Sequence, residues 1–499
     1  MSATPVRERI SWLLRVNRRL ARDPRLRAGK EFAAAFRAGG ERPLAPSQVT
    51  RWEDGTVVPR RETIRRYEDL LGLAPHSLTA LKDAVDRAAG TSPLIIAAGA
   101  VPDQRRFHEL LERATTGEPM TGQRWGELSE LVQACPGLVL HPPGLWERVS
   151  HRLLGELVVA EDTAWLQRQE AMSRLLGHPD AGVHAVDACI SLAVDRSTPV
   201  VVEPLSLLDA TAHPDANRHI CRTIAAADDG RSLYGALLAS VRKVRAGHFT
   251  PDELGRLGAS MTGLLDDSVL SRDLRPLIFE VGRSLAGGPA PGGPDHTRPP
   301  RPVARRAAIV AAAEVLPGHG PDPVLTGLVD DALFSANPDD RMHAAMFVAA
   351  TPYAPAVATA LLQDVVADFR RRSEAGLAPT LRTLTILGAT EHRTLIRQIL
   401  TAPGSSEAAR HAAAWATPHC AGAFDEDTWR RILQTQFEAW QRARSGLGEQ
   451  ILHGVTYGMG TDGHRTLLAE VRADDRLPTS SRTTAAWLLT TPAVIRPGS

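Results

Sequence analysis

The chain has 499 residues, of which 43% are hydrophobic and 23% charged, and its formal net charge is +1. A chain longer than the ~250–300 residues served by one core should form more than one domain, and this composition argues against a chain disordered throughout. No stretch reaches the ~18 consecutive apolar residues that a membrane span needs, so we expect a cytoplasmic protein without a membrane partner. The four cysteines lie far apart without a CxxC pair, which argues against a zinc ribbon or a disulfide framework.

Positive charge is concentrated at the N-terminus. Residues 1–90 contain 18 Lys or Arg and 11 Asp or Glu, whereas residues 91–499 contain 40 and 46. Such an asymmetry favours an N-terminal segment that meets a polyanion and a remainder that does not.

Apolar residues at helical spacing open the chain. Val6, Ile10, Leu13, Leu14 and Leu20 share one face, with arginines on the other faces, which predicts an amphipathic first helix. The stretch "GKEFAAAFRAGG" predicts a short second helix closed by two glycines, and the loop "ERPLA" follows. After the third helix, described next, "VVPRRETIRRYEDLLGL" and "PHSLTALKDAVDR" predict a fourth and a fifth helix.

The third helix is predicted from the nonapeptide "SQVTRWEDG", residues 47–55. At about 100° per residue, Val49, Trp52 and Glu53 share one arc of this helix, which we expect to pack inward. The opposite arc is polar and comprises Ser47, Gln48, Thr50 and Arg51. Such side chains on a short helix match base edges in the major groove, because arginine pairs with guanine and glutamine with adenine. Gly55 is expected to end the helix.

These residues carry a family resemblance. Val49, Trp52, Glu53 and Gly55, followed by Pro59 and the helix "ETIRRYEDLLGL", make residues 6–88 resemble the Xre-type, lambda-repressor-like helix-turn-helix family. The resemblance implies that the third helix is a recognition helix, with Val49 and Trp52 in the core and Glu53 as a structural acid paired with an arginine of the first helix. The base-contacting residues would be Ser47, Gln48, Thr50 and Arg51.

The resemblance also implies contacts to the phosphates of double-stranded DNA. They would come from the turn before the second helix and the loop after the third, which points to Lys30, Thr56, Arg60 and Arg61. Family analogy further suggests a homodimer on a two-fold symmetric site. One departure from the family is the connection "AGGERPLAP", which is longer than its usual tight turn.

The rest of the chain contains a divergent repeat. After a transition segment with "TSPLIIAAGAVP" extended and helices at 103–116 and 122–134, three phrases align without a gap. They are "LLGHPDAGVHAVDACISL", "ATAHPDANRHICRTIAAA" and "LFSANPDDRMHAAMFVAA", and weaker copies begin at Ser405 and Pro478. In each full copy Pro and Asp should stop one helix and cap the next, with Asp as the capping group. The unit resembles a HEAT-type repeat, which implies stacked helical pairs.

The histidine shared by the copies is the candidate metal ligand of this region. It recurs as His184, His219, His343 and His411, at equivalent positions of different repeats. Residues so placed should line up as a ladder and not converge on a tetrahedral site, so we expect structural roles and no metal.

No catalytic signature is recognisable. The chain lacks a GxSxG elbow, a P-loop, an HExxH pair and a Rossmann fingerprint, and we interpret the Gly-rich "YGMGTDGHR" as a turn between repeats. We therefore predict a non-enzymatic protein without a cofactor.

Together these patterns predict an all-α fold in five parts. They are a helix-turn-helix domain (1–90), a helical transition segment (91–150), a HEAT-like solenoid lobe (151–285), a Pro/Gly-rich linker or loop (286–302) and a second lobe (303–499). The function that fits is a sequence-specific DNA-binding transcriptional regulator whose body binds a protein, a peptide or a second protomer. The alternative is an α-solenoid interaction scaffold, or a sensor of a small ligand, with a helix-turn-helix that does not read DNA.

Overall fold

The chain forms an all-α structure, as predicted. The computed structural model describes residues 6–36, 44–90, 103–142, 144–195, 197–227, 230–266, 274–286, 300–317, 322–371, 377–388, 391–420, 422–491 and 494–495. Over these ranges the elements are helices, and the only extended pairing is a single bridge between Ala160 and Ile495. None of the helices so described is long and apolar enough to cross a membrane.

The chain divides into two compact units. Unit 1 comprises residues 1–60, 197–199 and 293–493, and unit 2 comprises residues 61–196, 200–292 and 494–499. The predicted head is shared between them, because its first three helices belong to unit 1 and the next two to unit 2. The five-part division drawn from the sequence stays a prediction.

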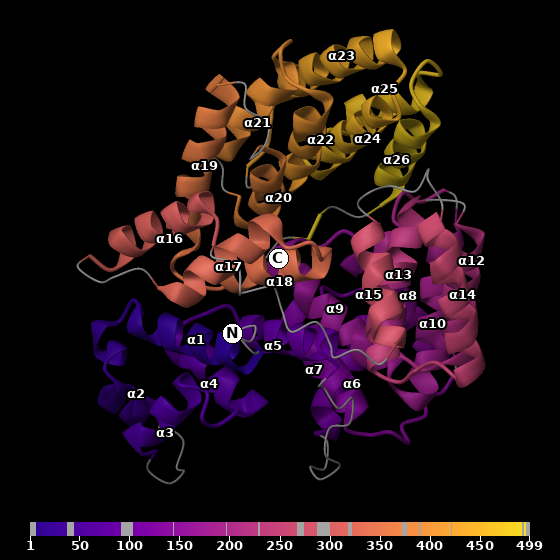
Figure 1. The fold of residues 1–499 in the computed structure, drawn as a ribbon. Coiled ribbons are helices and arrows are strands. Elements are labelled where there is room, and N and C mark those ends of the chain that lie inside the picture. The colour runs from indigo at the N-terminus through magenta and orange to yellow at the C-terminus, as the bar shows by residue number, and fades with distance from the viewer. Residues whose placement is uncertain are drawn as a thin grey trace. The chain divides into compact units, whose positions relative to one another are not determined.

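The helices of unit 2 alternate between two layers (Figure 1). One layer contains α6 (Gln104–Thr116), α8 (Gly144–Leu157), α10 (Pro179–Val194), α12 (Pro214–Ala226) and α14 (Pro251–Asp266). The other contains α7 (Gly122–Gln133), α9 (Asp162–Leu176), α11 (Val202–Leu207), α13 (Gly230–Arg245) and α15 (Arg275–Leu285). Consecutive members of a layer pack together, and so do neighbours across the layers. The unit begins with α4 (Arg61–Leu71) and α5 (Ser77–Ala88), of which α5 packs on α9.

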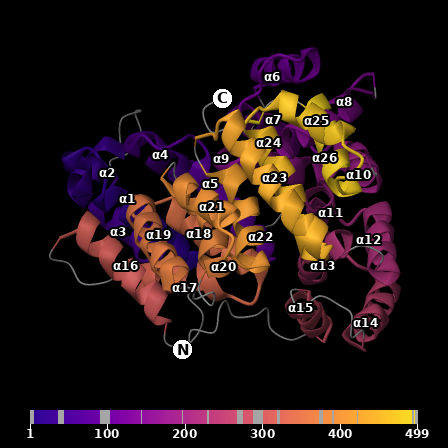
Figure 2. The same ribbon diagram turned by 90° about the horizontal axis from the view of Figure 1, so that it is seen from above.

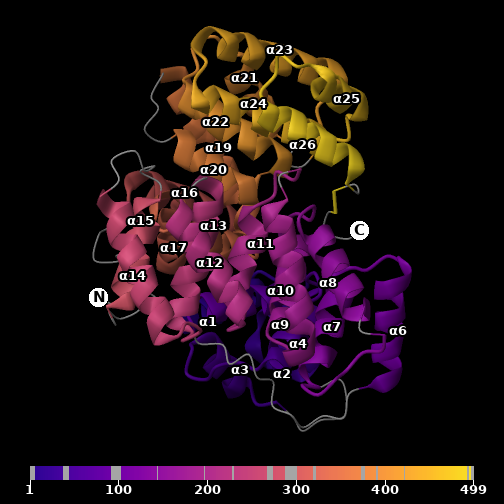
Figure 3. The same ribbon diagram turned by 90° about the vertical axis from the view of Figure 1, so that its right-hand side faces the viewer.

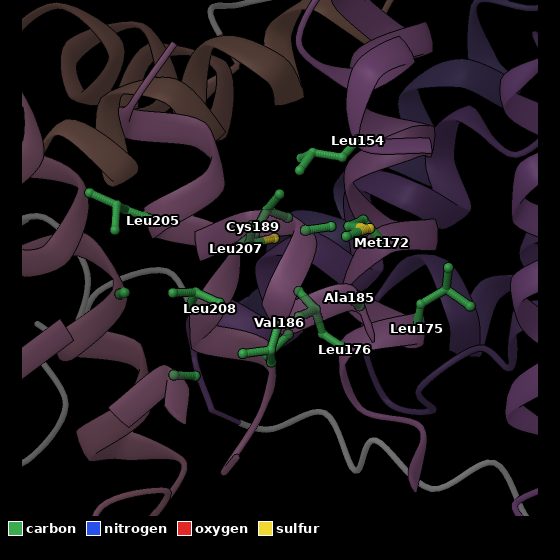
Figure 4. Packing of buried hydrophobic residues seen from close by; sticks show 14 of the residues in the cluster. Leu154, Met172, Leu175, Leu176, Ala185, Val186, Cys189, Leu205, Leu207 and Leu208 are labelled. Atoms are coloured by element: carbon green, nitrogen blue, oxygen red, sulfur yellow. The ribbon is translucent and has the colours of Figure 1, made fainter. Parts of the chain in front are cut away.

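Small residues allow close packing in this core. Ala181, Ala185 and Cys189 of α10 are fully buried, and Figure 4 shows the latter two among leucines of α9 and of the segment that follows α10. A Cβ on Gly182 would lie 2.8 Å from the carbonyl oxygen of Leu176, so α10 approaches the end of α9 at backbone distance. The Ala-rich helix of this repeated phrase therefore packs closely on its neighbour.

Unit 1 contains α1 (Val6–Arg19), α2 (Gly29–Phe36), α3 (Pro46–Glu53) and a C-terminal stack (Figures 2 and 3). One layer of the stack consists of α16 (Pro302–Val315), α19 (Ala354–Arg371), α21 (His392–Thr401) and α23 (Glu426–Ala443). The other consists of α18 (Pro338–Ala349), α20 (Leu377–Leu387), α22 (Glu407–Ala416), α24 (Gly446–Thr461) and α26 (Thr479–Thr490). Two further helices are α17 (Pro323–Phe334), against α16 and α18, and α25 (Arg465–Ala473), against α24 and α26.

The repeated phrases mark helix starts, but the predicted capping group is wrong. α10, α12 and α18 each begin at the proline of the phrase. The side chain that accepts from the first free amides is the residue before that proline: His178, His213 or Asn337. The N-cap is the last residue outside the helix, so the aspartate two places later lies inside the first turn. There its negative charge interacts favourably with the positive end of the helix dipole.

Other sequence-based expectations have mixed outcomes. The helices predicted at 103–116 and 122–134 are confirmed as α6 and α7. The Gly-rich stretch at 457–465 is not a turn throughout, because α24 continues to Thr461. Gly458 and Gly460 lie inside α24, where a Cβ would collide with Trp429 and with Leu488. The segment "TSPLIIAAGAVP", most of 286–302 and most of "AGGERPLAP" lie outside the described residues.

Candidate nucleic-acid interface

The candidate interface is built on α3. Its N-cap, Ala45, offers no capping side chain, and Pro46 occupies the first helical position, where its missing amide costs nothing. The helix ends as predicted, because Gly55 adopts a left-handed conformation with φ +78°. The following turn is closed by the amide of Thr56, which donates to Oδ1 of Asp54 at 2.7 Å.

The inner arc of α3 is buried as predicted. Val49, Trp52 and Glu53 are 1%, 8% and 5% exposed. The ring of Trp52 packs on Phe36 of α2, with a centroid separation of 5.4 Å. Phe36 in turn packs on Phe32 at 5.9 Å, so α2 and α3 share a small aromatic core.

Glu53 holds a buried ion pair with α1. Nε and Nη2 of Arg18 donate to Oε1 and Oε2 of Glu53 at 2.6 and 2.7 Å. The predicted pairing of this acid with an arginine of the first helix is confirmed. A two-point bond between a planar guanidinium and a carboxylate fixes orientation as well as distance, so it sets the rotation of α3 about its own axis.

The outer arc of α3 faces away from this core. Ser47, Thr50 and Arg51 are exposed, and Gln48 is half-buried. The hydroxyl of Thr50 also donates to the carbonyl of Pro46 at 3.4 Å, within the helix. The four residues predicted to contact bases therefore line one side of a short helix. Arg51 has the longest of these side chains and is the charged one.

The residues predicted to contact phosphates have different surroundings. Lys30 at the start of α2, Thr56 in the turn after α3 and Arg60 are exposed. Arg61 is half-buried at the start of α4, where Nη2 lies 2.8 Å from both Asp83 and Glu130. Burial lowers the pKa of Arg61, the neighbouring Arg174 adds to this, and the two acids oppose it. A guanidinium already held by two carboxylates is poorly placed to bind phosphate.

Sequence reasoning missed arginines in the turn before α2. A 3-10 turn, Pro24–Arg27, is capped by Asp23, whose Oδ1 accepts from the amide of Arg25 at 3.0 Å. Arg22, Arg25 and Arg27 are exposed around it. The guanidinium of Arg25 lies 3.0 Å from Asp23, which lowers the pKa of that carboxyl. The signal was present in "ARDPRLRAGK", where four basic residues surround one Pro-containing turn.

One acid lies beside the candidate interface. Asp54 is exposed at the end of α3, and the hydrogen bonds from Thr56 lower the pKa of its carboxyl. It is therefore charged at neutral pH and disfavours phosphate close to the C-terminal end of α3. Besides Arg51 on α3 itself, exposed cations lie around the start of α2 and at Arg60.

The recurrent histidines lie in the two helix stacks. His184 on α10, His219 on α12 and His411 on α22 are half-buried, and His343 on α18 is buried. Burial lowers the pKa of His219, and the nearby Arg222 adds to this. Over the ranges that the structure describes, no group of three or more His, Cys, Asp or Glu side chains is placed to hold a metal ion.

Comparison with known proteins adds no relative to this picture. No protein-family model, curated protein or solved structure matches this chain.

Proposed function

We propose that this chain is a sequence-specific DNA-binding transcriptional regulator, with an Xre-type helix-turn-helix head and a HEAT-like α-solenoid body. The observation that supports it best is the division of α3. Its inner arc is fixed by the Trp52 stack and the Arg18–Glu53 pair, and its outer arc exposes Ser47, Thr50 and Arg51. A short helix held on one side and polar on the other is the arrangement that a major groove accepts.

The body supports a partner-binding role. In each unit, alternating helices form two layers in which every member packs on its predecessor, the pattern of a helical-repeat stack. Such stacks offer extended surfaces for a protein, a peptide or a second protomer. DNA is the partner proposed for the head, a homodimer on a two-fold symmetric site is the proposed assembly, and the cytoplasm is the compartment in which it would act.

Selection from a random-sequence DNA pool by the full chain tests this function. We expect recovery of a defined motif at moderate salt, with tighter binding to that motif than to a scrambled duplex. Arg51→Ala should lose about 1–3 kcal/mol of discrimination at one base pair, the contribution of one arginine–guanine contact. Enrichment of no motif, with equal binding to all duplexes, would reject the regulator.

A scaffold that does not read DNA is the second candidate, and two side chains favour it. Arg61 is occupied by Asp83 and Glu130, and the charged Asp54 lies beside the reading face. If the full chain enriches no motif from the pool, we expect it instead to bind a protein partner in a stoichiometric complex through its helical stacks.

A further inference from the structure

Helix α1 is buried on more than the face that its apolar pattern predicts. Leu13 and Leu14 are buried as expected. Arg9 and Trp12, which lie outside the arc of those leucines, are buried as well, and so is Asn17 within that arc. A helix of an independent head should expose Arg9 and Trp12 to solvent. Their burial therefore indicates a second packing partner for α1.

That partner is the C-terminal helix pair α17 and α18, which belongs to the same unit. Nη2 of Arg9 donates to Oδ2 of Asp331 in the last turn of α17 at 2.8 Å. Nε1 of Trp12 donates to Oδ2 of Asp322 at 2.8 Å, and Oδ1 of the same carboxylate caps α17 by accepting from the amide of Val324. A third hydrogen bond joins α1 to the end of α18, where Nδ2 of Asn17 donates to the carbonyl of Ala350 at 2.8 Å.

The Arg9–Asp331 pair is the costly member of this set. The two side chains are 10% and 4% exposed. Removing one partner of such a pair leaves the other charge buried without compensation, which is strongly unfavourable. Separating α1 from α17 would therefore carry a large energetic cost.

The opposite side of α1 contacts α3, the helix proposed to read DNA and called the reading helix below. Arg18 of α1 holds Glu53 of α3, and Oγ of Ser11 lies 3.3 Å from the position that a Cβ on Gly55 would occupy. Buried contacts therefore run from α17 through α1 to α3 without leaving unit 1. Ser47, Thr50 and Arg51 on the outer arc of α3 are exposed, so these contacts support α3 and do not cover them.

We propose that α17 and α18 position the reading helix: they hold α1 through Arg9, Trp12 and Asn17, and α1 holds α3 through Arg18. Residues 322–350 then belong functionally to the DNA-binding head. A change imposed on α17 by a partner of the C-terminal stack is transmitted to α3 and alters affinity for DNA. This inference rests on the proposed function for its consequence at DNA, and on the contacts alone for its structural step.

Hydrogen exchange in the full chain, without DNA, tests the structural step. The variants are Arg9→Asp, Asp331→Arg and the double charge swap, with Asp427→Arg at an exposed site of α23 as the control. We expect the amides of residues 44–58 to exchange about tenfold faster in each single variant, since local opening follows the loss of local contacts. The double swap should restore slow exchange, and the control should match the parent chain.

Faster exchange at 322–350 with unchanged exchange at 44–58 would overturn the inference, because α17 would then be uncoupled from α3. If a single variant does not fold, Trp12→Phe removes one donor and keeps an aromatic side chain, and the same comparison applies to it.

DNA binding tests the consequence separately. On the motif selected by the parent chain, each single variant should bind about tenfold more weakly with the same base preference, and the double swap should recover affinity. Unchanged affinity of the single variants would overturn the inference while leaving the regulator intact. Failure of the parent chain to select any motif rejects the regulator, and the exchange experiment then decides the structural step on its own.

Discussion

Arg18 of α1 and Glu53 of α3 are joined by two hydrogen bonds of 2.6 and 2.7 Å, with both side chains buried. This pair is satisfied only when Glu53 faces α1. Thr50 and Arg51 then necessarily face outward, because they lie on the other arc of the same helix. The direction in which α3 presents its polar side chains is therefore set by one charged contact.

The first prediction concerns the stability that this pair provides. Glu53→Gln leaves the Arg18 guanidinium buried without a counter-charge, and we expect a loss of about 3–5 kcal/mol in the free energy of unfolding of unit 1. Urea unfolding of full-length variants measures it. The pair of Asp474 and Arg476, whose side chains are 26% and 68% exposed, is the control, and Asp474→Asn should have no resolvable effect. Equal losses at both sites would show that the buried pair does not hold α3.

The sequence was sufficient for this local architecture. The spacing of Val49, Trp52 and Glu53 predicts the buried arc, because helical periodicity is a local property of the chain. The left-handed Gly55 and the proline-led starts of α10 and α12 follow from local rules for the same reason.

The remaining features depend on contacts between distant parts of the chain. Arg9 meets Asp331 and Trp12 meets Asp322, each more than 300 positions away, and no local pattern encodes such a pairing. The ion pairs of Arg61 likewise depend on the fold, since its partners lie on α5 and α7. From the sequence alone, Arg61 is a basic residue close to the predicted phosphate contacts. In the fold its charge is already balanced by two carboxylates.

The second prediction separates Arg60 from Arg61 on DNA. Arg60 is exposed, so Arg60→Ala should weaken binding to all sequences and reduce the slope of log K against log salt by about 1. Arg61→Ala should leave that slope unchanged and lower stability instead, because it removes one arginine partner from both Asp83 and Glu130. Arg174 stays paired with Asp83, and Arg65 with Glu130. Salt titrations of both variants measure the slopes. A reduced slope for Arg61→Ala would restore it to the phosphate-contacting set.

The third prediction concerns the turn after α3. Gly55 has φ +78°, and an added Cβ would lie 3.3 Å from Oγ of Ser11, so Gly55→Ala should cost about 1–2 kcal/mol. Gly29 begins α2 with no atom within 4 Å of an added Cβ, which makes Gly29→Ala the matched control. Thermal unfolding of the two variants compares them. A neutral Gly55→Ala would mean that the turn can relax without disturbing α3.

The fourth prediction tests histidine as a helix cap. Nδ1 of His178 accepts from the amides of Asp180 and Ala181 at 3.3 and 3.2 Å, while Nε2 lies 3.0 Å from the carbonyl oxygen of Cys135. His178→Ala should destabilise unit 2 by about 1–2 kcal/mol, and His178→Asn, which keeps a capping oxygen, should cost less. Chemical unfolding ranks the variants. Equal losses for both would assign the effect to the Cys135 contact and not to the cap.

The last prediction concerns pH and the contact between α1 and α17. Burial raises the pKa of Asp331 to about 7, Arg9 opposes this, and Asp340 of α18 and Asp330 of α17 add to it. The ordinary value is 3.8, so between these pH values the folded chain retains a proton that the unfolded chain has released. The contribution of this carboxyl to the free energy of unfolding therefore falls as the pH rises from about 4 to about 7, and it is constant above that interval.

Asp331→Asn removes this titration, so the parent chain should lose stability relative to the variant as the pH rises from about 5 to about 7, with no further change by about pH 8. Urea unfolding of both proteins across this range gives the difference directly, and Asp427→Asn on the exposed face of α23 is the control. A difference that stays constant with pH would mean that Arg9 keeps the Asp331 carboxyl ionised throughout. The contact between α1 and α17 would then be a permanent ion pair, insensitive to protons, and only a physical displacement of α17 could alter α3.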